Sequence, residues 1–168
     1  MSSYFVPPLN YGMVEYDLTR SGVVHQLNFP FLERLNLRTV LYLSQDEPSQ
    51  QFLSFLDEQG IHFRRTHQSS STTAAETTGS LSEAQVLSAL EVILRPENYP
   101  LHVMCKQGRN TTGTVIGCLR KLQRWNLTSI FEEHRRYTTS KVRILNEQFI
   151  EMFDANSVTI PPNHPDWL

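Results

Sequence analysis

The sequence predicts a single α/β domain in which helices flank a central, mostly parallel β-sheet. Short β-branched or apolar segments alternate along the chain with segments whose apolar residues repeat every three to four positions, a pattern typical of strands and amphipathic helices. The 168 residues are 39% hydrophobic and 10% aromatic, which suffices for the core of about one domain. We find no internal repeat, and expect one domain over residues 1–168 with peripheral tails at 1–12 and 157–168.

The N-terminal half is expected to form a strand with a turn, a short helix, a buried strand, a second helix and a further strand, at residues 13–22, 28–37, 38–44, 49–60 and 61–66. Asn28 has the position of a helix cap, and RTVLYLS at 38–44 is a continuous β-branched run. The helix at 49–60 places Phe52, Leu53, Phe55 and Leu56 on one face, and Gly60 ends it.

The C-terminal half begins with residues 67–80, a Ser/Thr-rich segment without periodicity that is predicted to be a mobile loop. A helix at 80–94 is expected to open with a capping box from Ser80 to Glu83. The remaining predicted elements are a strand at 99–105, a helix that ends near residue 125, and helices at 127–137 and near 144–154.

Charge is distributed unevenly along the chain. The segment 106–143 holds nine Lys or Arg and two acids, so it carries +7, whereas the net charge is −2 and the rest carries −9. The segment therefore concentrates positive potential just downstream of Cys105. The alternative is that these side chains only solvate helix faces.

Other classes of protein and site are disfavoured. We find no signal peptide and no apolar run of about 18 residues, so we expect a cytoplasmic protein without a membrane partner. No nucleic-acid partner is expected either. Two cysteines do not make a disulfide framework and fit a reducing compartment. No metal or other cofactor is expected.

The stretch LHVMCKQGRNTTGTVIGCLRKL at 101–122 carries the strongest motif. Cysteine-dependent phosphatases use C-x-x-G-x-x-R-[ST]-G between a strand and a helix, and Cys105, Gly108, Thr112 and Gly113 fall into register with it. The arginine does not, because Thr111 is the sixth residue after the cysteine.

A strand, a glycine-containing loop and a helix start place backbone amides around the sulfur, and such amides bind phosphate dianions and favour a thiolate. The predicted phosphate-binding residues are Lys106, Gln107, Gly108, Arg109, Asn110, Thr111, Thr112 and Gly113. Gly108 permits close backbone approach, and the Thr112 hydroxyl is placed to donate to the sulfur or the anion. Arg109 and Lys106 are expected at the rim. The alternative is that Cys105 is an ordinary buried thiol.

The chain resembles the atypical dual-specificity phosphatases of plants and fungi, within the protein-tyrosine-phosphatase superfamily. It is most similar to the fungal tyrosine-phosphatase-like proteins named for oxidant-induced cell-cycle arrest. Besides the loop, the resemblance rests on the segments TRSG at 19–22, NFPFLERLNLRTVLYLSQDEP at 28–48, GCLRKLQRWNLTSIFEEHRRY at 117–137 and QFIEMFD at 148–154. It implies a compact phosphatase domain, a phosphocysteine intermediate, no metal, and inositol pyrophosphates, phosphoproteins or phosphoinositides as substrates.

The resemblance assigns Cys105 as the nucleophile. It also relates four basic residues to those that could flank a polyphosphate pocket, namely Arg135, Arg136, Lys141 and Arg143. Three departures weaken catalysis. Thr111 replaces the bidentate arginine, whose loss costs about 3–4 kcal/mol. Met104 stands where the family has histidine, and Glu76 is the only carboxylate at 67–80 for a general acid, a function typically worth about 10²–10⁴ in rate.

Three functions follow as alternatives. The leading one is a pseudophosphatase that binds a phosphorylated protein or inositol phosphate, or contacts related family members, with weak or no turnover. The second is a working phosphatase in which Arg109 or a distant basic residue compensates. The third is a redox-responsive module built on Cys105. Cys118 is expected to be a core residue rather than a resolving partner.

Overall fold

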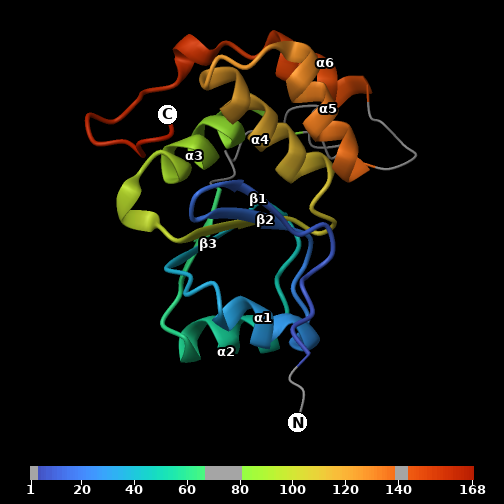
Figure 1. Cartoon of the computed structure of the whole chain (residues 1–168), viewed down its shortest axis with the longest axis vertical. Coiled ribbons are helices and arrows are strands. Elements are labelled where there is room, and N and C mark those ends of the chain that lie inside the picture. Colours follow the sequence, from blue (N-terminus) through green and yellow to red (C-terminus); the bar gives the residue numbers. More distant parts are fainter. Residues whose placement is uncertain (1–3, 67–80, 139–143) are drawn as a thin grey trace.

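The computed structural model describes residues 4–66, 81–138 and 144–168 of the chain. It has a five-stranded sheet in the order β1-β2-β5-β3-β4 (Figure 1). The strands are β1 (Gly12–Glu15), β2 (Leu18–Ser21), β3 (Thr39–Tyr42), β4 (His62–Arg65) and β5 (Leu101–Met104). Only the β1–β2 pair is antiparallel, and the other three pairings are parallel. This confirms the predicted fold class.

Helices cover both faces of the sheet, as Figure 1 shows. The α-helices are α1 (Phe29–Glu33), α2 (Gln50–Glu58), α3 (Glu83–Ile93), α4 (Asn110–Leu122), α5 (Leu127–Thr138) and α6 (Ile144–Met152). Short 3₁₀ turns are η1 (Gln26–Asn28), η3 (Pro96–Asn98) and η4 (Ala155–Ser157). In the described part of the chain, no helix has the length and apolar character that a bilayer crossing requires.

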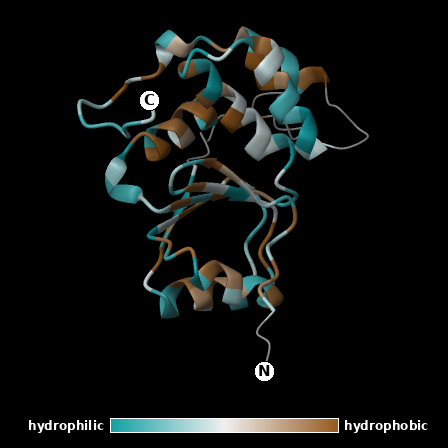
Figure 2. Ribbon diagram, viewed as in Figure 1, coloured by the Kyte–Doolittle hydropathy of each residue, from teal (hydrophilic) through white to brown (hydrophobic). Residues whose placement is uncertain are grey.

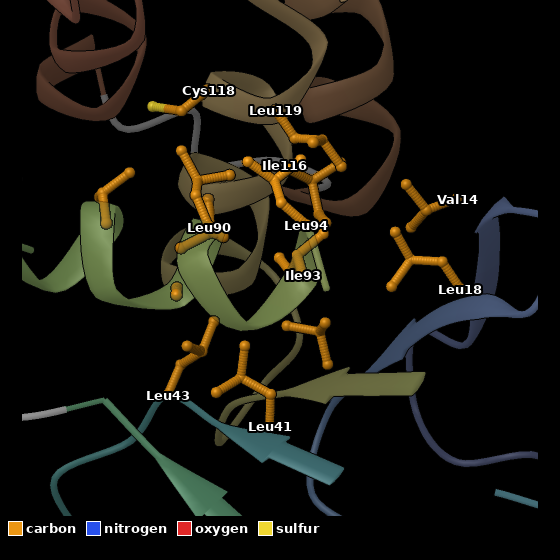
Figure 3. Close-up of a cluster of buried hydrophobic side chains, with 14 of the residues drawn as sticks. Val14, Leu18, Leu41, Leu43, Leu90, Ile93, Leu94, Ile116, Cys118 and Leu119 are labelled. Atoms are coloured by element: carbon orange, nitrogen blue, oxygen red, sulfur yellow. The ribbon is translucent and has the colours of Figure 1, made fainter. Parts of the chain in front are cut away.

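Two hydrophobic clusters lie on opposite faces of the sheet, because successive strand residues point to opposite faces. Leu41 of β3 and Val103 of β5 pack with α3, α4 and α6, whereas Val40 and Met104 pack with α1 and α2. Figure 3 shows the first cluster, with Leu90 and Ile116 lying over Leu41. Figure 2 shows hydrophobic (brown) segments in the helices on both sides of the sheet.

Two helix boundaries differ from the sequence-based expectation. The capping box of α3 is Ser82 with Gln85, not Ser80 with Glu83: the Gln85 amide donates to Ser82 Oγ at 3.3 Å, and Ser82 N donates to Gln85 Oε1 at 2.9 Å. Ser80 lies outside the described residues. Two overlapping S-x-x-E/Q sequences were available, and the second one caps the helix.

Helix α4 ends at Leu122 rather than near residue 125. Arg124 adopts a left-handed conformation with φ 65°, and the next amide, that of Trp125, donates to the carbonyl of Arg120 at 3.0 Å. This is a Schellman ending, which glycine usually marks; here an arginine occupies the left-handed position, so the sequence carried no stop signal.

Asn28 occupies the predicted N-cap position of α1, but its side chain makes no capping hydrogen bond to that helix. Asn28 lies in η1, where its Oδ1 accepts a hydrogen bond from His25 N at 2.9 Å and its Nδ2 donates to Val6 O at 3.1 Å. Its side chain therefore fastens the segment before β1 to the start of α1.

Candidate phosphate-binding site

Cys105 directly follows the central strand of the sheet. The parallel register aligns the last residues of β2, β5 and β3, which are Ser21, Met104 and Tyr42. Ligands of parallel α/β sheets bind at this carboxyl edge. The loop from Cys105 to Arg109 crosses that edge and continues into α4, whose N-terminus presents unpaired amides.

The carbonyl oxygens of the loop are held outward by three donors from the N-terminal part of the chain. Val23 N donates to Lys106 O at 3.1 Å, and Asn10 Nδ2 donates to Gln107 O at 2.8 Å. Arg20 Nη2 donates to Gly108 O at 2.9 Å. In a trans peptide the N–H points opposite to the C=O, so the next amide in each case is turned inward.

One of these inward amides reaches the sulfur. Gly108 N donates to Cys105 Sγ at 3.2 Å, and the same peptide carries the Gln107 carbonyl that Asn10 binds. A donor on the carbonyl side polarises the N–H and strengthens its bond to sulfur. Cys105 is nearly fully buried at the base of the loop, with 4% of its surface exposed.

Gly108 is required by the path of the loop. Its φ is +66°, and an added Cβ would lie 2.4 Å from Gly22 N and 2.5 Å from the carbonyl carbon of Ser21. Only glycine combines this backbone conformation with so close an approach to the end of β2.

A cavity of about 230 Å³ opens above the sulfur. Its lining residues are Ser44, Leu81, Cys105, Lys106, Gln107, Asn110, Thr111, Thr114, Asn146 and Phe149. Thr111, in the position of the missing arginine, therefore faces the space where a guanidinium would act. Gly108, Thr112 and Gly113 are buried behind the lining.

Several polar atoms next to the cavity have no hydrogen-bond partner among the described residues. They are Arg109 Nε, Asn110 Oδ1, Thr112 Oγ1 and Asn146 Nδ2. Thr112 therefore does not donate to the sulfur, which accepts from the Gly108 amide, and its expected donation to a bound anion stays a prediction. Asn146 Nδ2 belongs to a residue that lines the cavity and can donate to a bound anion, whereas Asn110 Oδ1 can only accept a hydrogen bond.

The basic residues predicted at the rim are distributed differently. Lys106 is exposed and forms an ion pair with Asp46 at 3.3 Å. Arg135 binds Glu147 of α6 at 2.7 Å, and neither Arg135 nor Arg136 lines the cavity. Glu76, Lys141 and Arg143 lie outside the described residues, as does the loop predicted to be mobile at 67–80.

Some of the positive charge of segment 106–143 is used structurally. Arg120 is buried in α4 and forms ion pairs with Glu15 of β1 and with Glu133 of α5, the latter at 2.9 Å. Lys121 donates to backbone oxygens at the end of α6, including Ile150 O at 3.1 Å. These cations hold elements together and are not available to a ligand.

A buried histidine that the sequence analysis missed supports the floor of the loop. His102 Nδ1 and Nε2 lie 2.8 Å from Thr19 Oγ1 and Ser21 Oγ respectively. Ser21 donates its hydroxyl proton to Gly22 O at 2.7 Å, so it accepts from a protonated Nε2. Burial lowers the pKa of His102 to about 4, which keeps the ring neutral, and the Ser21 hydrogen bonds favour the tautomer with the proton on Nε2.

The remaining cysteine and the residue before the loop are both core side chains. Cys118 is fully buried in the cluster shown in Figure 3, and burial raises the pKa of its thiol to about 12. Met104 packs on the other face of the sheet, in the cluster with α1 and α2. Among the described residues, no group of three His, Cys, Asp or Glu is arranged to hold a metal ion.

The role of Asn10 can be tested with Asn10→Gly. Asn10 has φ 55°, a conformation that glycine adopts freely, so the variant removes the donor to Gln107 O without imposing backbone strain. A lost hydrogen bond of about 1 kcal/mol predicts roughly fivefold weaker sulfate binding, measured by calorimetry. The control is Asn36→Gly, at a left-handed asparagine (φ 47°) between α1 and β3, which should leave sulfate binding unchanged. Equal effects of both variants would contradict a role of Asn10 in the loop.

Comparison with known proteins places these features in a family. A model of a tyrosine phosphatase family matches residues 5–168. The chain is 55% identical to the probable tyrosine-protein phosphatase DG1060 of Dictyostelium discoideum, over 99% of this chain and 98% of that protein. It is 51% identical to the putative tyrosine-protein phosphatase OCA1 of Mycosarcoma maydis, over 91% and 96%.

Solved phosphatase structures have the same fold. The core catalytic domain of the PP-IP phosphatase SIW14 from S. cerevisiae, crystallised with citrate, superposes with a TM-score of 0.82. The two chains are 39% identical over 92% of this chain and 91% of that one. The chain therefore belongs to the tyrosine phosphatase family.

Proposed function

We propose that this protein uses the loop from Cys105 to Gly113 to bind a phosphorylated ligand, and that it turns the ligand over weakly or not at all. The inward amides of the loop from Cys105 to Gly113 form a cradle for an anion. The observation that supports the proposal is the combination of this cradle with Thr111 in the arginine position. The Gly108 amide donates to the sulfur, so the loop already holds the arrangement that accepts negative charge. Thr111 lines the cavity but brings no positive charge to it.

Loss of the arginine weakens catalysis more than it weakens anion binding. Backbone amides bind an anion in its ground state, whereas the bidentate arginine of the motif stabilises charge as the phosphoryl group transfers. Loss of that donor costs about 3–4 kcal/mol, or 10²–10³ in rate. Ground-state binding is less affected because the loop amides and the helix N-terminus remain.

Inositol pyrophosphates and phosphoproteins are the ligand classes that we propose. The first is supported by similarity to SIW14, whose crystal structure is described as that of a PP-IP phosphatase. The second is supported by relatives described as tyrosine-protein phosphatases. The cavity walls include Leu81 and Phe149, which offer apolar contact to a ligand's non-phosphate part.

The alternative is an active cysteine-dependent phosphatase that hydrolyses these ligands through a phosphocysteine. It is favoured by the sulfur itself, which lies at the base of the cavity with an amide donor in place. In that case another donor must replace the arginine, and Arg109, whose buried Nε has no partner among the described residues, is the candidate.

A binding and turnover experiment distinguishes the two functions. Phosphate release is measured from an inositol pyrophosphate, a phosphotyrosine peptide and an aryl phosphate, with the SIW14 core measured alongside. Binding of inorganic phosphate is measured by calorimetry on the same preparations. We expect phosphate binding in the wild type and in Cys105→Ser, and release at least about 100-fold slower than by the SIW14 core. Release at a comparable rate that Cys105→Ser abolishes would establish the active enzyme instead.

A further inference from the structure

Arg20 is a buried cation beneath the phosphate-binding loop. It belongs to β2 and is 1% exposed, and it forms no ion pair with a described carboxylate. An arginine keeps its proton in proteins, so a full positive charge is enclosed here. Burying such a charge without an anion is costly. The surroundings must supply negative charge or oriented dipoles to offset that cost.

The contacts of the guanidinium identify what it supports. Nη2 donates to Gly108 O at 2.9 Å, and the guanidinium carbon stacks 3.7 Å from the centre of the Tyr137 ring on α5. An ideal Cβ on Gly113 would lie 3.6 Å from Nη2, which places the group under the start of α4 as well. Nε and Nη1 are buried with no partner among the described residues.

Tyr137 keeps the guanidinium against the loop. An added Cβ on Gly12 of β1 would overlap the Tyr137 hydroxyl and lie 3.0 Å from its ring carbon Cζ. The ring is thus packed between β1 and Arg20, and it cannot move away while β1 remains in place. The cation has a fixed position relative to the cradle.

The charges around Arg20 include the sulfur of Cys105. Burial lowers the pKa of Arg20, whereas the negative charges that Tyr137, Glu133 and Cys105 can carry raise it and the cation of Arg120 lowers it. His134 of α5, itself buried beside Gly113, has its pKa lowered first by burial and also by Arg20. Cys105 is the member of this set that lies in the cradle.

We infer that Arg20 is a positioning residue whose fixed positive charge stabilises anionic sulfur and a bound phosphate from behind the loop. The inference rests on the proposed function, because it concerns the same cradle. Arg20 acts through the Gly108 carbonyl, which it holds outward so that the Arg109 amide faces the anion, and through its charge. It does not line the cavity.

The test compares Arg20→Met, which removes the charge, with Arg20→Lys, which keeps it. The pH midpoint of Cys105 alkylation by iodoacetamide reports the thiolate, and calorimetry with inorganic sulfate reports the cradle. In Arg20→Met we expect the alkylation midpoint to rise by about one pH unit and sulfate affinity to fall about tenfold. In Arg20→Lys the alkylation midpoint should stay close to the wild-type value. Arg38→Met, which removes an exposed arginine before β3, should change neither.

An unchanged midpoint in folded Arg20→Met overturns the inference. A midpoint displaced equally in Arg20→Lys and Arg20→Met overturns the role of charge. If the wild type fails to bind sulfate or phosphate but the midpoint still shifts, the proposed function fails and the inference about the sulfur stands.

A second measurement uses the wild-type protein in case Arg20→Met does not fold. The ¹³Cζ and ¹⁵Nε signals of Arg20 are followed by NMR as pH is raised. We expect a titration at the same midpoint as Cys105 alkylation, and its loss in Cys105→Ser. Signals of Arg20 that stay constant while Cys105 ionises would overturn the inference.

Discussion

Replacing Gly108 by alanine is expected to destabilise the protein by about 2–5 kcal/mol and to weaken anion binding at least tenfold. Two costs add. A non-glycine residue at φ +66° is strained by about 1–2 kcal/mol, and overpacking costs about 1–3 kcal/mol more. The overlap is with backbone atoms of Ser21 and Gly22 rather than with a flexible side chain. Relief therefore requires the loop to move off β2, which takes the amide away from Cys105. Urea denaturation and sulfate calorimetry measure both effects.

Gly60→Ala is the matched control. Gly60 follows α2 with φ +67°, and nothing lies within 4 Å of its ideal Cβ. Gly60→Ala should be destabilised only by the strain of the left-handed conformation, about 1–2 kcal/mol, and should leave sulfate binding unchanged. If the two variants were equally destabilised, the contact between the loop and β2 would be loose, and the argument that this contact fixes the amides would be wrong.

The sequence predicted where the site lies, but it did not predict the residues that hold the loop in place. Local signals sufficed for the loop: the apolar run before Cys105, the spacing of Gly108 and Gly113, and the helix after them. The same spacing identified Thr111 as the residue in the arginine position, and it does line the cavity.

The supporting residues had no local signal. Arg20 is 88 residues and Asn10 is 97 residues from the loop carbonyls that they bind. Their roles follow only from the sheet order, which places β2 beside β5. TRSG contributed to the family resemblance without indicating that its arginine lies under the loop. Asn146 likewise reaches the cavity only because α6 packs on α4.

The large excess of positive charge at 106–143 was a poor guide to which side chains line the cavity. The excess of Lys and Arg at 106–143 indicated an anion site, yet among the described residues the only lysine or arginine lining the cavity is Lys106. Arg120 and Arg135 pair with carboxylates from other parts of the fold. Net charge along a sequence does not show which side chains are neutralised after folding.

Restoring the motif with Thr111→Arg is expected to create or raise phosphatase turnover by about 10²–10³. Thr111 lines the cavity above Cys105, so a guanidinium there can bind two oxygens of a phosphoryl group while the loop amides hold the others. Binding of phosphate should strengthen by about 1–3 kcal/mol, the range of a charge-assisted hydrogen bond. Turnover should remain below that of the SIW14 core, because Met104 stands in place of the family's histidine and residues 67–80 contain no aspartate.

Three variants separate the guanidinium from other effects. Thr111→Lys adds a charge without the planar fork and should improve binding more than turnover. Thr128→Arg places the same side chain at an exposed position of α5 and should change neither. Cys105→Ser in the Thr111→Arg background should abolish the gained turnover while phosphate still binds. If the wild type already releases phosphate as fast as the SIW14 core and Thr111→Arg slows it, the cradle is built around a different donor, and the absence of arginine at position 111 has no mechanistic consequence.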